Sequence, residues 1–600
     1  MRRIEDYALI GDTQTAALVS NDGSIDWACF PRFDSDACFA ALLGGPEHGR
    51  WRIGPAGEIL DRRRRYRPGT LVLETELATA GGRCRVIDFM PVRGRAPDIV
   101  RIVEGVEGEV ELVSDLTIRF GTGAIVPWVR RRGDALVAIA GADALCLRGD
   151  LAVHGEGLST VGRFRLSAGE RRAMTLTWFP SSQDLPEPVR PDEALGETEA
   201  WWRRWSDAQR YEGPYAAAVA TSSMVLKALT YEPTGGIVAA PTTSLPEQPG
   251  GVRNWDYRYC WLRDATMTLY ALMLAGYRDE AAEWREWLLR ATAGDPARLQ
   301  IMYGVAGERR LDEHEAPWLP GYERSRPVRV GNAAHSQLQL DVYGEVMDAM
   351  FQARRFGLAP DRWAWDLETK LLDALESKWR QPDEGIWEIR SERLQFTHSK
   401  VMAWVGFDRG LKSIERFGTP GPAEKWRRLR DEIHADVCEH AFDTTRGTFT
   451  QSYGRPELDG SLLLMPMVGF LPADDPRVAG TVRAIERELM VDGFLLRYRT
   501  NGEHPIDGLP PGEGAFLPCT LWLADAYVAM GRREEAALIF ERVLGVANDV
   551  GLLSEELEPK SRRLLGNFPQ ALTHLAVVNT AFNLSSQPTS SARHRKAHGG

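Results

Sequence analysis

The C-terminal two-thirds of the chain contains twelve segments with a helical spacing of apolar residues, and the connections between them alternate between long and short. Short turns such as Gly531-Arg532 follow the even-numbered segments, whereas long stretches rich in Trp, Arg, Asp, Glu and Gly follow the odd-numbered ones. Helical hairpins stacked in a ring would place all six long loops at one end, and long loops in compact domains tend to be functional. The alternation therefore predicts a ring of helical hairpins over residues 214–585, with the chemistry at its loop end. The predicted helices are 216–231, 261–276, 278–293, 333–356, 361–379, 397–417, 421–440, 459–468, 475–489, 514–530, 533–547 and 568–584.

Length and charge exclude several classes of protein. A chain of 600 residues suggests two or more domains. Its net charge of -11 argues against a nucleic-acid partner, because no basic stripe is available to neutralise phosphates. No stretch approaches the roughly 18 apolar residues of a membrane span, and the N-terminus meets acidic residues before a signal-type apolar segment could form. We therefore expect no membrane attachment and a cytoplasmic location.

The cysteines support the same location. They are odd in number, scattered and without a CxxC pair, which fits free thiols in a reducing compartment better than disulfides or a zinc site. They are Cys29, Cys38, Cys84, Cys146, Cys260, Cys438 and Cys519.

The first 190 residues differ from the rest. Short alternating runs such as TLVLETELATA and RCRVIDFMPV are separated by glycine-rich turn signals, which predicts a β-sandwich domain over 1–190. A proline-rich, acidic stretch then leads into an amphipathic segment, GETEAWWRRWSDAQRY, so we expect a linker helix within 191–213. Residues 586–600 have the composition of a disordered tail.

The first long loop ends in NWDYRYCWLRDATM, a dense mixture of indole rings and charged groups at a helix N-terminus. Sugars require such a mixture, because their C–H faces lie on aromatic rings while their hydroxyls bind Asp and Arg. This motif supplies Trp255, Asp256, Trp261, Arg263 and Asp264 as candidate sugar-binding residues. Alternatively, Arg263 and Asp264 form a local ion pair in the first turn of the helix.

Two carboxylates stand on the third and sixth long loops, which lie opposite each other in a ring of six hairpins. Glu388 follows Trp387 in DEGIWEIRSERLQF, and Glu555 lies in the Ser-Glu-Glu turn of LLSEELEP. Hydrolysis of a glycosidic bond uses such a pair, one protonated and one ionised. Burial beside Trp387 would raise the pKa of Glu388, which suits the acid. Taken singly, a glutamate is more often a solvated surface charge.

The second and fifth long loops add arginines beside aromatic residues. Arg329 and Arg497 either recognise sugar hydroxyls or anchor their loops to acidic neighbours. Glu513 precedes the tenth helix and is a further candidate for the pocket, although helix capping alone would explain it. His398 and Lys400 open the sixth helix, where we favour a structural role.

These motifs together resemble glycoside hydrolase family 15, the glucoamylase and bacterial trehalase group, over almost the whole chain. The sequence carries IEDYALIGDTQTAALVSNDGSIDWACFPRFDS, NWDYRYCWLRDA, SRPVRVGNAA, GIWE, HSKVMAW, RYR, GEGAFLPCT and LLSEE in family order. The resemblance implies a β-sandwich followed by an (α/α)6 barrel. It also implies an inverting hydrolase that releases terminal glucose without a metal or an organic cofactor.

Carried over by motif, Glu388 resembles the general acid of the family and Glu555 the general base. The residues that resemble the binders of the terminal glucose are Arg263, Asp264, Arg329 and Arg497. Fungal glucoamylases carry a second Glu immediately after the acid, and here that position is Ile389. The departure concerns the leaving-group side and weakens a starch-degrading assignment.

The expected substrate is a small α-glucoside, because a cytoplasmic enzyme would not meet starch. We predict a trehalase-type hydrolase, with a glucoamylase-like or isomaltose-type α-glucosidase as the alternative. A non-catalytic carbohydrate-binding protein would have lost one of the two carboxylates, and both are present. The sequence leaves the oligomeric state open, a homo-oligomer included.

Overall fold

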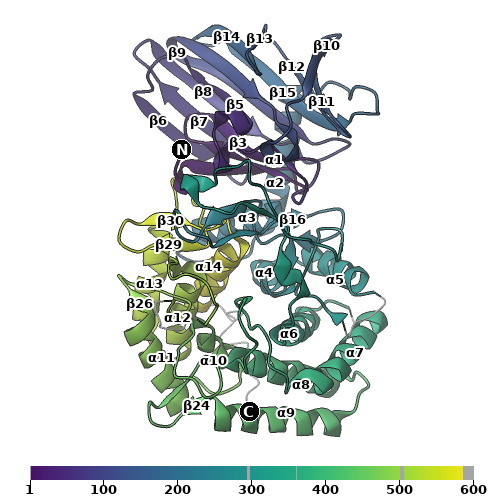
Figure 1. The fold of residues 1–600 in the computed structure, drawn as a ribbon, viewed down its shortest axis with the longest axis vertical. Coiled ribbons are helices and arrows are strands. Elements are labelled where there is room, and N and C mark those ends of the chain that lie inside the picture. Colours follow the sequence, from purple (N-terminus) through teal and green to yellow (C-terminus); the bar gives the residue numbers. More distant parts are fainter. Residues whose placement is uncertain (1, 294–297, 360, 501–505, 586–600) are drawn as a thin grey trace.

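A computed structural model describes residues 2–293, 298–359, 361–500 and 506–585 of the chain. A β-rich N-terminal domain sits on one side of a larger helical region (Figure 1). The tail expected to be disordered, 586–600, lies outside the described residues.

The N-terminal domain is an antiparallel sheet system built around one long strand, β9 (Asp98–Thr117). The first half of β9 pairs with β8 and β15, and its second half pairs with β5 and β14. One continuous strand thus belongs to two groups of strands, and apolar side chains from both groups fill the core between them. The remaining strands are β1 (Tyr7–Gly11), β2 (Ala16–Ser20), β3 (Ser24–Cys29), β4 (Ala37–Phe39), β5 (Arg50–Pro55), β6 (Asp61–Tyr66), β7 (Leu73–Ala78), β8 (Gly82–Phe89), β10 (Trp128–Arg132), β11 (Ala135–Ala140), β12 (Asp143–Gly149), β13 (His154–Glu156), β14 (Ser159–Ser167) and β15 (Arg171–Pro180), with the short helix α1 (Phe120–Gly123) after β9.

Helix α2 (Pro191–Ser206) connects the two parts of the molecule. Its Trp202 is fully buried, and the helix packs against β15 of the N-terminal domain. Trp205 stacks on Tyr277 of the helical region with ring centroids 3.9 Å apart, and its indole N–H donates to Glu280 Oε1 over 2.7 Å. The apolar face of α2 is therefore shared between the two parts.

The helical region contains twelve helices in the described residues, and each overlaps one of the predicted segments. Six of them, α4, α6, α8, α10, α12 and α14, contact one another in cyclic order and line one common cavity. The other six lie outside this ring (Figure 1). Five of them, α5, α7, α9, α11 and α13, each follow a ring helix after a short turn, whereas α3 begins the helical region and packs against α14. The helices are α3 (Ala216–Ala228), α4 (Leu262–Ala275), α5 (Asp279–Ala291), α6 (Asp341–Arg355), α7 (Arg362–Lys378), α8 (Thr397–Phe417), α9 (Ala423–His440), α10 (Met465–Val468), α11 (Pro476–Leu489), α12 (Leu517–Ala529), α13 (Arg533–Leu544) and α14 (Ala571–Leu584).

One predicted boundary differs clearly from the structure. The segment predicted at 333–356 begins as a 3-10 turn, Ala333–Ser336, and α6 starts only at Asp341. Between them, the backbone N–H groups of Leu338 and Leu340 donate to the carboxylates of Glu384 and Asp383, each over 2.9 Å. Side chains from a distant loop thus replace the helical hydrogen bonds at this point.

The long loops carry short antiparallel strand pairs. They are β16 (Thr230–Tyr231), β17 (Gly236–Ile237), β18 (Thr243–Pro246), β19 (Asn254–Asp256), β20 (Cys260–Trp261), β21 (Met302–Tyr303), β22 (His314–Glu315), β23 (Arg329–Val330), β24 (Phe442–Asp443), β25 (Thr448–Phe449), β26 (Met490–Val491), β27 (Phe494–Leu495), β28 (Ala515–Phe516), β29 (Glu556–Glu558) and β30 (Arg563–Leu565). All seven cysteines are free thiols, and six are buried. Within the described ranges, none of the helices combines the length and the apolar character needed to cross a bilayer.

Candidate active site

The long loops enclose a polar pocket that brings together residues far apart in the sequence. Four of the predicted site residues line it, namely Trp255, Trp387, Glu388 and Arg497. Among the other predicted residues, Trp261 and Arg263 bond to Glu388, Glu513 bonds to Arg497, and Glu555 bonds to the lining residue Tyr257. The long loops, whose position the alternation of long and short connections predicted, therefore do gather polar side chains in one pocket.

Glu388 lies in a loop between α7 and α8 and is held from two sides. The indole N–H of Trp261 donates to its Oε1 over 3.1 Å, and Arg263 Nη1 donates to the same oxygen over 3.3 Å. Its backbone φ of +52° lies in the left-handed region, which costs free energy for a residue with a Cβ. Burial raises the pKa of the Glu388 carboxyl, although the Arg263 cation opposes the rise. The geometry therefore favours a protonated Glu388 compared with a glutamate in water.

Trp387 fixes the loop that carries Glu388 through contacts with neighbouring loops and helices. Its indole N–H donates to both carboxylate oxygens of Asp459, over 3.0 and 2.9 Å, and its ring lies against Phe516 and Trp522. The indole is 8% exposed, so it contributes an edge to the pocket rather than an open stacking surface.

Glu555 precedes β29 and is almost completely buried. The hydroxyl of Tyr257 donates to its Oε1 over 2.6 Å, and a Cβ at Gly566 would lie 2.7 Å from its Oε2, so only glycine fits there. Burial and the nearby Glu247 carboxylate raise the pKa of Glu555 to about 8, while Arg497 and the Tyr257 hydroxyl oppose the rise. Its protonation state is thus set by its immediate neighbours.

The two candidate catalytic carboxylates are connected through two aromatic rings. Tyr257, which holds Glu555, packs edge to face on Trp261 with centroids 5.3 Å apart, and Trp261 in turn donates to Glu388. A single motif, NWDYRYCW, therefore supplies one hydrogen-bond donor to each carboxylate. Both donors favour the ionised form of the group that they bind.

Arg263 and Asp264 form the local ion pair considered from the sequence, but the pair does not use all of their polar atoms. Asp264 Oδ2 accepts from Arg263 Nε and Nη2 over 3.2 and 2.9 Å. Asp264 Oδ1 is buried and has no hydrogen-bond partner within the described part of the chain. Because an unpaired buried oxygen is costly, this atom is suited to accept a hydrogen bond from a ligand hydroxyl.

Arg329 does not line the pocket and anchors a loop instead. Its Nη1 donates to the backbone carbonyls of Val252 and Asn254, each over 2.9 Å, and its guanidinium lies 4.4 Å from the centre of the Trp255 ring. Its Nε also lies 3.4 Å from Glu313 Oε1, so these contacts favour the alternative in which Arg329 anchors its loop to acidic neighbours. Arg390, which we did not single out from the sequence, lies 4.1 Å from the same ring and lines the pocket.

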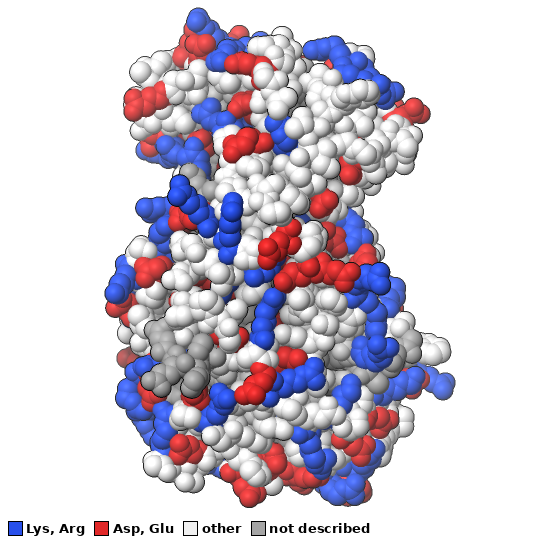
Figure 2. Space-filling view, viewed as in Figure 1, with Lys and Arg blue, Asp and Glu red and all other residues white. Residues whose placement is uncertain are grey.

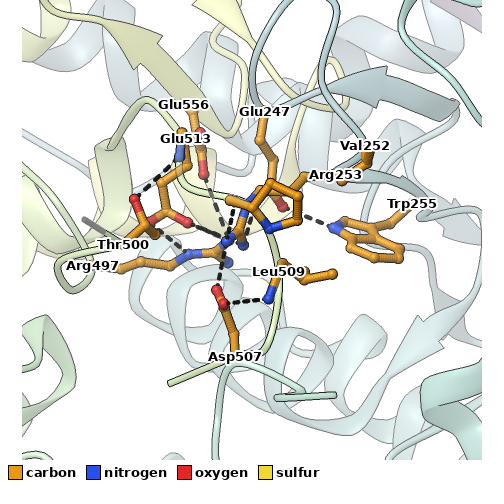
Figure 3. A network of polar contacts seen from close by, with 12 residues as sticks. Glu247, Val252, Arg253, Trp255, Arg497, Thr500, Asp507, Leu509, Glu513 and Glu556 are labelled. Atoms are coloured by element: carbon orange, nitrogen blue, oxygen red, sulfur yellow. Dashed lines mark hydrogen bonds and ion pairs between the residues drawn. The ribbon is translucent and has the colours of Figure 1, made fainter. Parts of the chain in front are cut away.

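A buried network of charges surrounds Arg497 (Figure 3). Arg497 donates to Glu247 over 2.8 Å and to both oxygens of Glu513 over 3.1 and 3.0 Å. Arg253 lies beside it and donates to Asp507 over 2.7 Å. Burial raises the pKa of Glu513, and Arg497 opposes the rise. Arg497 is therefore held in place by carboxylates on two loops.

Three carboxylates of this network, those of Glu247, Glu513 and Glu556, have oxygens within 4.8 Å of one another and offer the donor set of a cation site. Arg497 already donates to two of them and supplies the positive charge that their proximity demands. Burial, followed by Glu247 and Glu513, raises the pKa of Glu556 well above its usual range. Arg497 thus supplies positive charge to the network, and burial disfavours the ionised form of Glu513 and Glu556.

Asp256, a candidate sugar-binding residue from the sequence, bonds to protein groups in this structure. It is completely buried, and its carboxylate accepts from Arg258 over 2.9 and 2.7 Å and from the Gly331 N–H over 3.1 Å. All of these partners are protein groups that tie β19 to the loop after β23. These contacts favour a structural role for Asp256 over sugar binding.

Several pocket residues were not identified from the sequence. Tyr257 could have been found, because it stands within NWDYRYCW, but nothing in the sequence distinguishes a hydrogen-bonding tyrosine from a packing one. Glu247, Arg253 and Asp507 lie in stretches without a recognisable motif. Only the folded chain brings them together.

Comparison with known proteins agrees with this arrangement. The model of "Glycosyl hydrolases family 15" matches residues 213–582, and that of "Trehalase-like, N-terminal" matches residues 1–150. A trehalase of Mycobacterium tuberculosis is 39% identical, covering 97% of this chain and 89% of that protein. A trehalase of Mycolicibacterium smegmatis is 40% identical, covering 97% and 91%.

The fold is similar to that in a crystal structure of a bacterial glucoamylase in complex with acarbose. The TM-score is 0.74, and the superposition covers 99% of this chain and 96% of the other, at 13% sequence identity. Together with the family match over more than half of the chain, these findings lead to one assignment. The chain belongs to glycoside hydrolase family 15 and is a glycoside hydrolase.

Proposed function

We propose that this enzyme is an α,α-trehalase that hydrolyses trehalose with inversion. The observation that carries the proposal is the similarity to two trehalases over nearly the whole chain, including the N-terminal part. The pocket supports it, because Glu388 lines it beside arginine and indole groups, and Glu555 accepts a hydrogen bond from the lining residue Tyr257.

In this proposal, Glu388 is the general acid and Glu555 is the general base. Burial of Glu388 favours the proton that it must give to the leaving oxygen. Glu555 must be ionised to remove a proton from water, and the hydrogen bond from Tyr257 and the positive charge of Arg497 both favour that form. The high pKa of Glu555, about 8, means that its active form increases as the pH rises through neutrality.

The reaction then takes place in one displacement. Glu388 protonates the glycosidic oxygen while Glu555 removes a proton from a water on the opposite face of the sugar. We expect the carboxyl groups of Glu388 and Glu555 to lie roughly 6.5 to 9.5 Å apart, the separation that leaves room for this water in an inverting enzyme. The unpartnered oxygen of Asp264 and the pocket face of Arg497 would bind hydroxyls of the terminal glucose. Trehalose would yield one β-glucose and one α-glucose.

We also propose the finer architecture that this function requires, a β-sandwich at 1–190, a linker helix within 191–213 and an (α/α)6 barrel at 214–585. The division of β9 between two groups of strands supports the sandwich. The cyclic contacts of six helices around one cavity support the barrel. A cytoplasmic location remains a prediction from the free cysteines.

A substrate panel tests the proposal. Purified enzyme is incubated with trehalose, maltose, isomaltose and soluble starch, and released glucose is measured; trehalose should be hydrolysed fastest. Proton NMR at early times should show α- and β-glucose in equal amounts from trehalose. Faster hydrolysis of starch or maltose would overturn the substrate assignment, and accumulation of α-glucose alone would overturn inversion.

A further inference from the structure

The N-terminal domain contains a second cavity, of about 400 Å³, far along the chain from the catalytic motifs. It opens where β10 to β12 diverge from β13 and β14. Its volume lies within the range of small-molecule sites, ~300 to 1,000 Å³. Its walls are mainly apolar and include Leu116, Leu136, Ala138, Leu147 and Val153. Such a surface binds hydrocarbon better than sugar, because it offers few hydrogen-bonding groups.

The mouth of this cavity is basic. Arg130, Arg131 and His154 are the titratable residues that line it, and no Asp or Glu lines it. Within the described ranges, no carboxylate forms an ion pair with Arg130 or Arg131, whereas Glu156 lies 3.8 Å from His154. In β10, Arg131 pairs with the cavity residue Leu136 and shares its face, whereas Arg130 pairs with Val137 on the other face of the sheet. Arg131 therefore brings a positive charge without an acidic partner to the apolar opening, and its Nη2 donates to the Val153 carbonyl over 3.4 Å.

Exposed apolar side chains surround the same opening. Trp128 is 83% exposed on β10, and Val129 and Leu158 are 50% and 66% exposed. Five of the ten large hydrophobic residues exposed in the described structure lie between 125 and 158. Figure 2 shows that uncharged residues cover much of the end of the domain where Figure 1 places β10 to β12, with basic side chains near its rim. Concentrated exposure of this kind marks a binding surface.

We propose that this cavity binds a fatty acid, with the hydrocarbon chain between the strands and the carboxylate at Arg131. The apolar walls select the chain, and a planar guanidinium group can bind a carboxylate with two hydrogen bonds. Because Arg131 has no acidic partner, its charge disfavours a cationic amphiphile of equal length. Binding here is independent of the proposed trehalase reaction, because none of these residues lines the catalytic pocket.

Binding to the intact enzyme tests the proposal, with laurate compared with dodecyltrimethylammonium by titration calorimetry. Laurate should bind one per chain, at least about tenfold more tightly than the cation, and butyrate should not bind. Saturable laurate binding with this charge preference supports the site. Equal affinity for the cationic amphiphile, or no saturable laurate binding, overturns it. Attachment to phosphatidylglycerol vesicles without binding of free laurate would also overturn it, since the surface would then bind membranes.

Variants locate the ligand. Ala138→Trp fills the cavity and should abolish laurate binding. The exposed variant Arg131→Glu should weaken it by about tenfold or more, because the charge-assisted hydrogen bonds are replaced by repulsion. Arg163→Glu, an exposed change on β14 outside the cavity, is the matched control and should bind normally. Hydrolytic activity should be unchanged in all three proteins, and unchanged laurate binding in Arg131→Glu would overturn the assignment.

Discussion

The substitution Tyr257→Phe, which removes one hydroxyl, should shift the acidic limb of the pH profile of hydrolysis to higher pH. The maximal rate at the plateau should stay unchanged. The Tyr257 O–H donates to Glu555 Oε1 over 2.6 Å in a fully buried setting, and it opposes the rise in the pKa of Glu555 that burial causes. A donor to a carboxylate stabilises its ionised form, so loss of the hydroxyl raises the pKa further. The general base would then be protonated over a wider range of pH.

The magnitude follows from the strength of this hydrogen bond. A hydrogen bond to a charged group contributes about 1.5 to 3 kcal/mol. At about 1.36 kcal/mol for each pKa unit, its loss raises the pKa of Glu555 by roughly one to two units. The pKa starts at about 8. At neutral pH the ionised fraction, and with it kcat/KM, should therefore fall about 10- to 100-fold.

Initial rates of trehalose hydrolysis between pH 5 and about pH 10 give the acidic limb of kcat/KM, which reports the free enzyme. Tyr211→Phe is the control, because its hydroxyl bonds the Ala581 carbonyl away from the pocket. The control should keep the wild-type profile. An acidic limb at its original pH in Tyr257→Phe, with a uniform loss of rate at every pH, would show that Tyr257 only shapes the pocket and would refute the assignment of Glu555 as the base.

Four further substitutions test the remaining roles. Glu388→Gln and Glu555→Gln should each lower kcat by about 100- to 10,000-fold while trehalose still binds in calorimetry, and near-normal turnover in either variant would exclude its role. Asp264→Asn should raise KM and lower kcat/KM by about 10- to 100-fold, because the unpartnered oxygen loses its charge; an unchanged KM would exclude sugar binding. Glu556→Gln should unfold at a higher temperature than the wild type at pH 7. Where folding raises the pKa of a carboxyl, the protein loses stability as the pH rises above the pKa that this carboxyl has in the unfolded chain, and an amide in its place removes this loss. A lower unfolding temperature of Glu556→Gln would show that Glu556 is ionised.

The helices could be predicted from the sequence because their signals are local. The segment predicted at 397–417 coincides with α8, whose apolar spacing and following Gly418 define both its inward face and its end. Gly418 adopts a φ of +68°, the left-handed conformation that ends a helix and that glycine adopts without strain. The boundary at Asp341 could not be predicted, because the hydrogen bonds that replace the helix come from Asp383 and Glu384, about 40 residues away.

The sequence alone determined the type of elements, the end of the helical ring where the chemistry would lie, and the residue types that resemble a family motif. Only the tertiary structure decided which carboxylates are available. Asp256 and Asp264 belong to one motif and are both buried, yet Arg258 and Gly331 occupy the first while the second keeps an unpartnered oxygen. Whether a carboxylate can bind a ligand depends on the neighbours that share its space. Those neighbours come from distant loops, so the spacing along the chain does not reveal them.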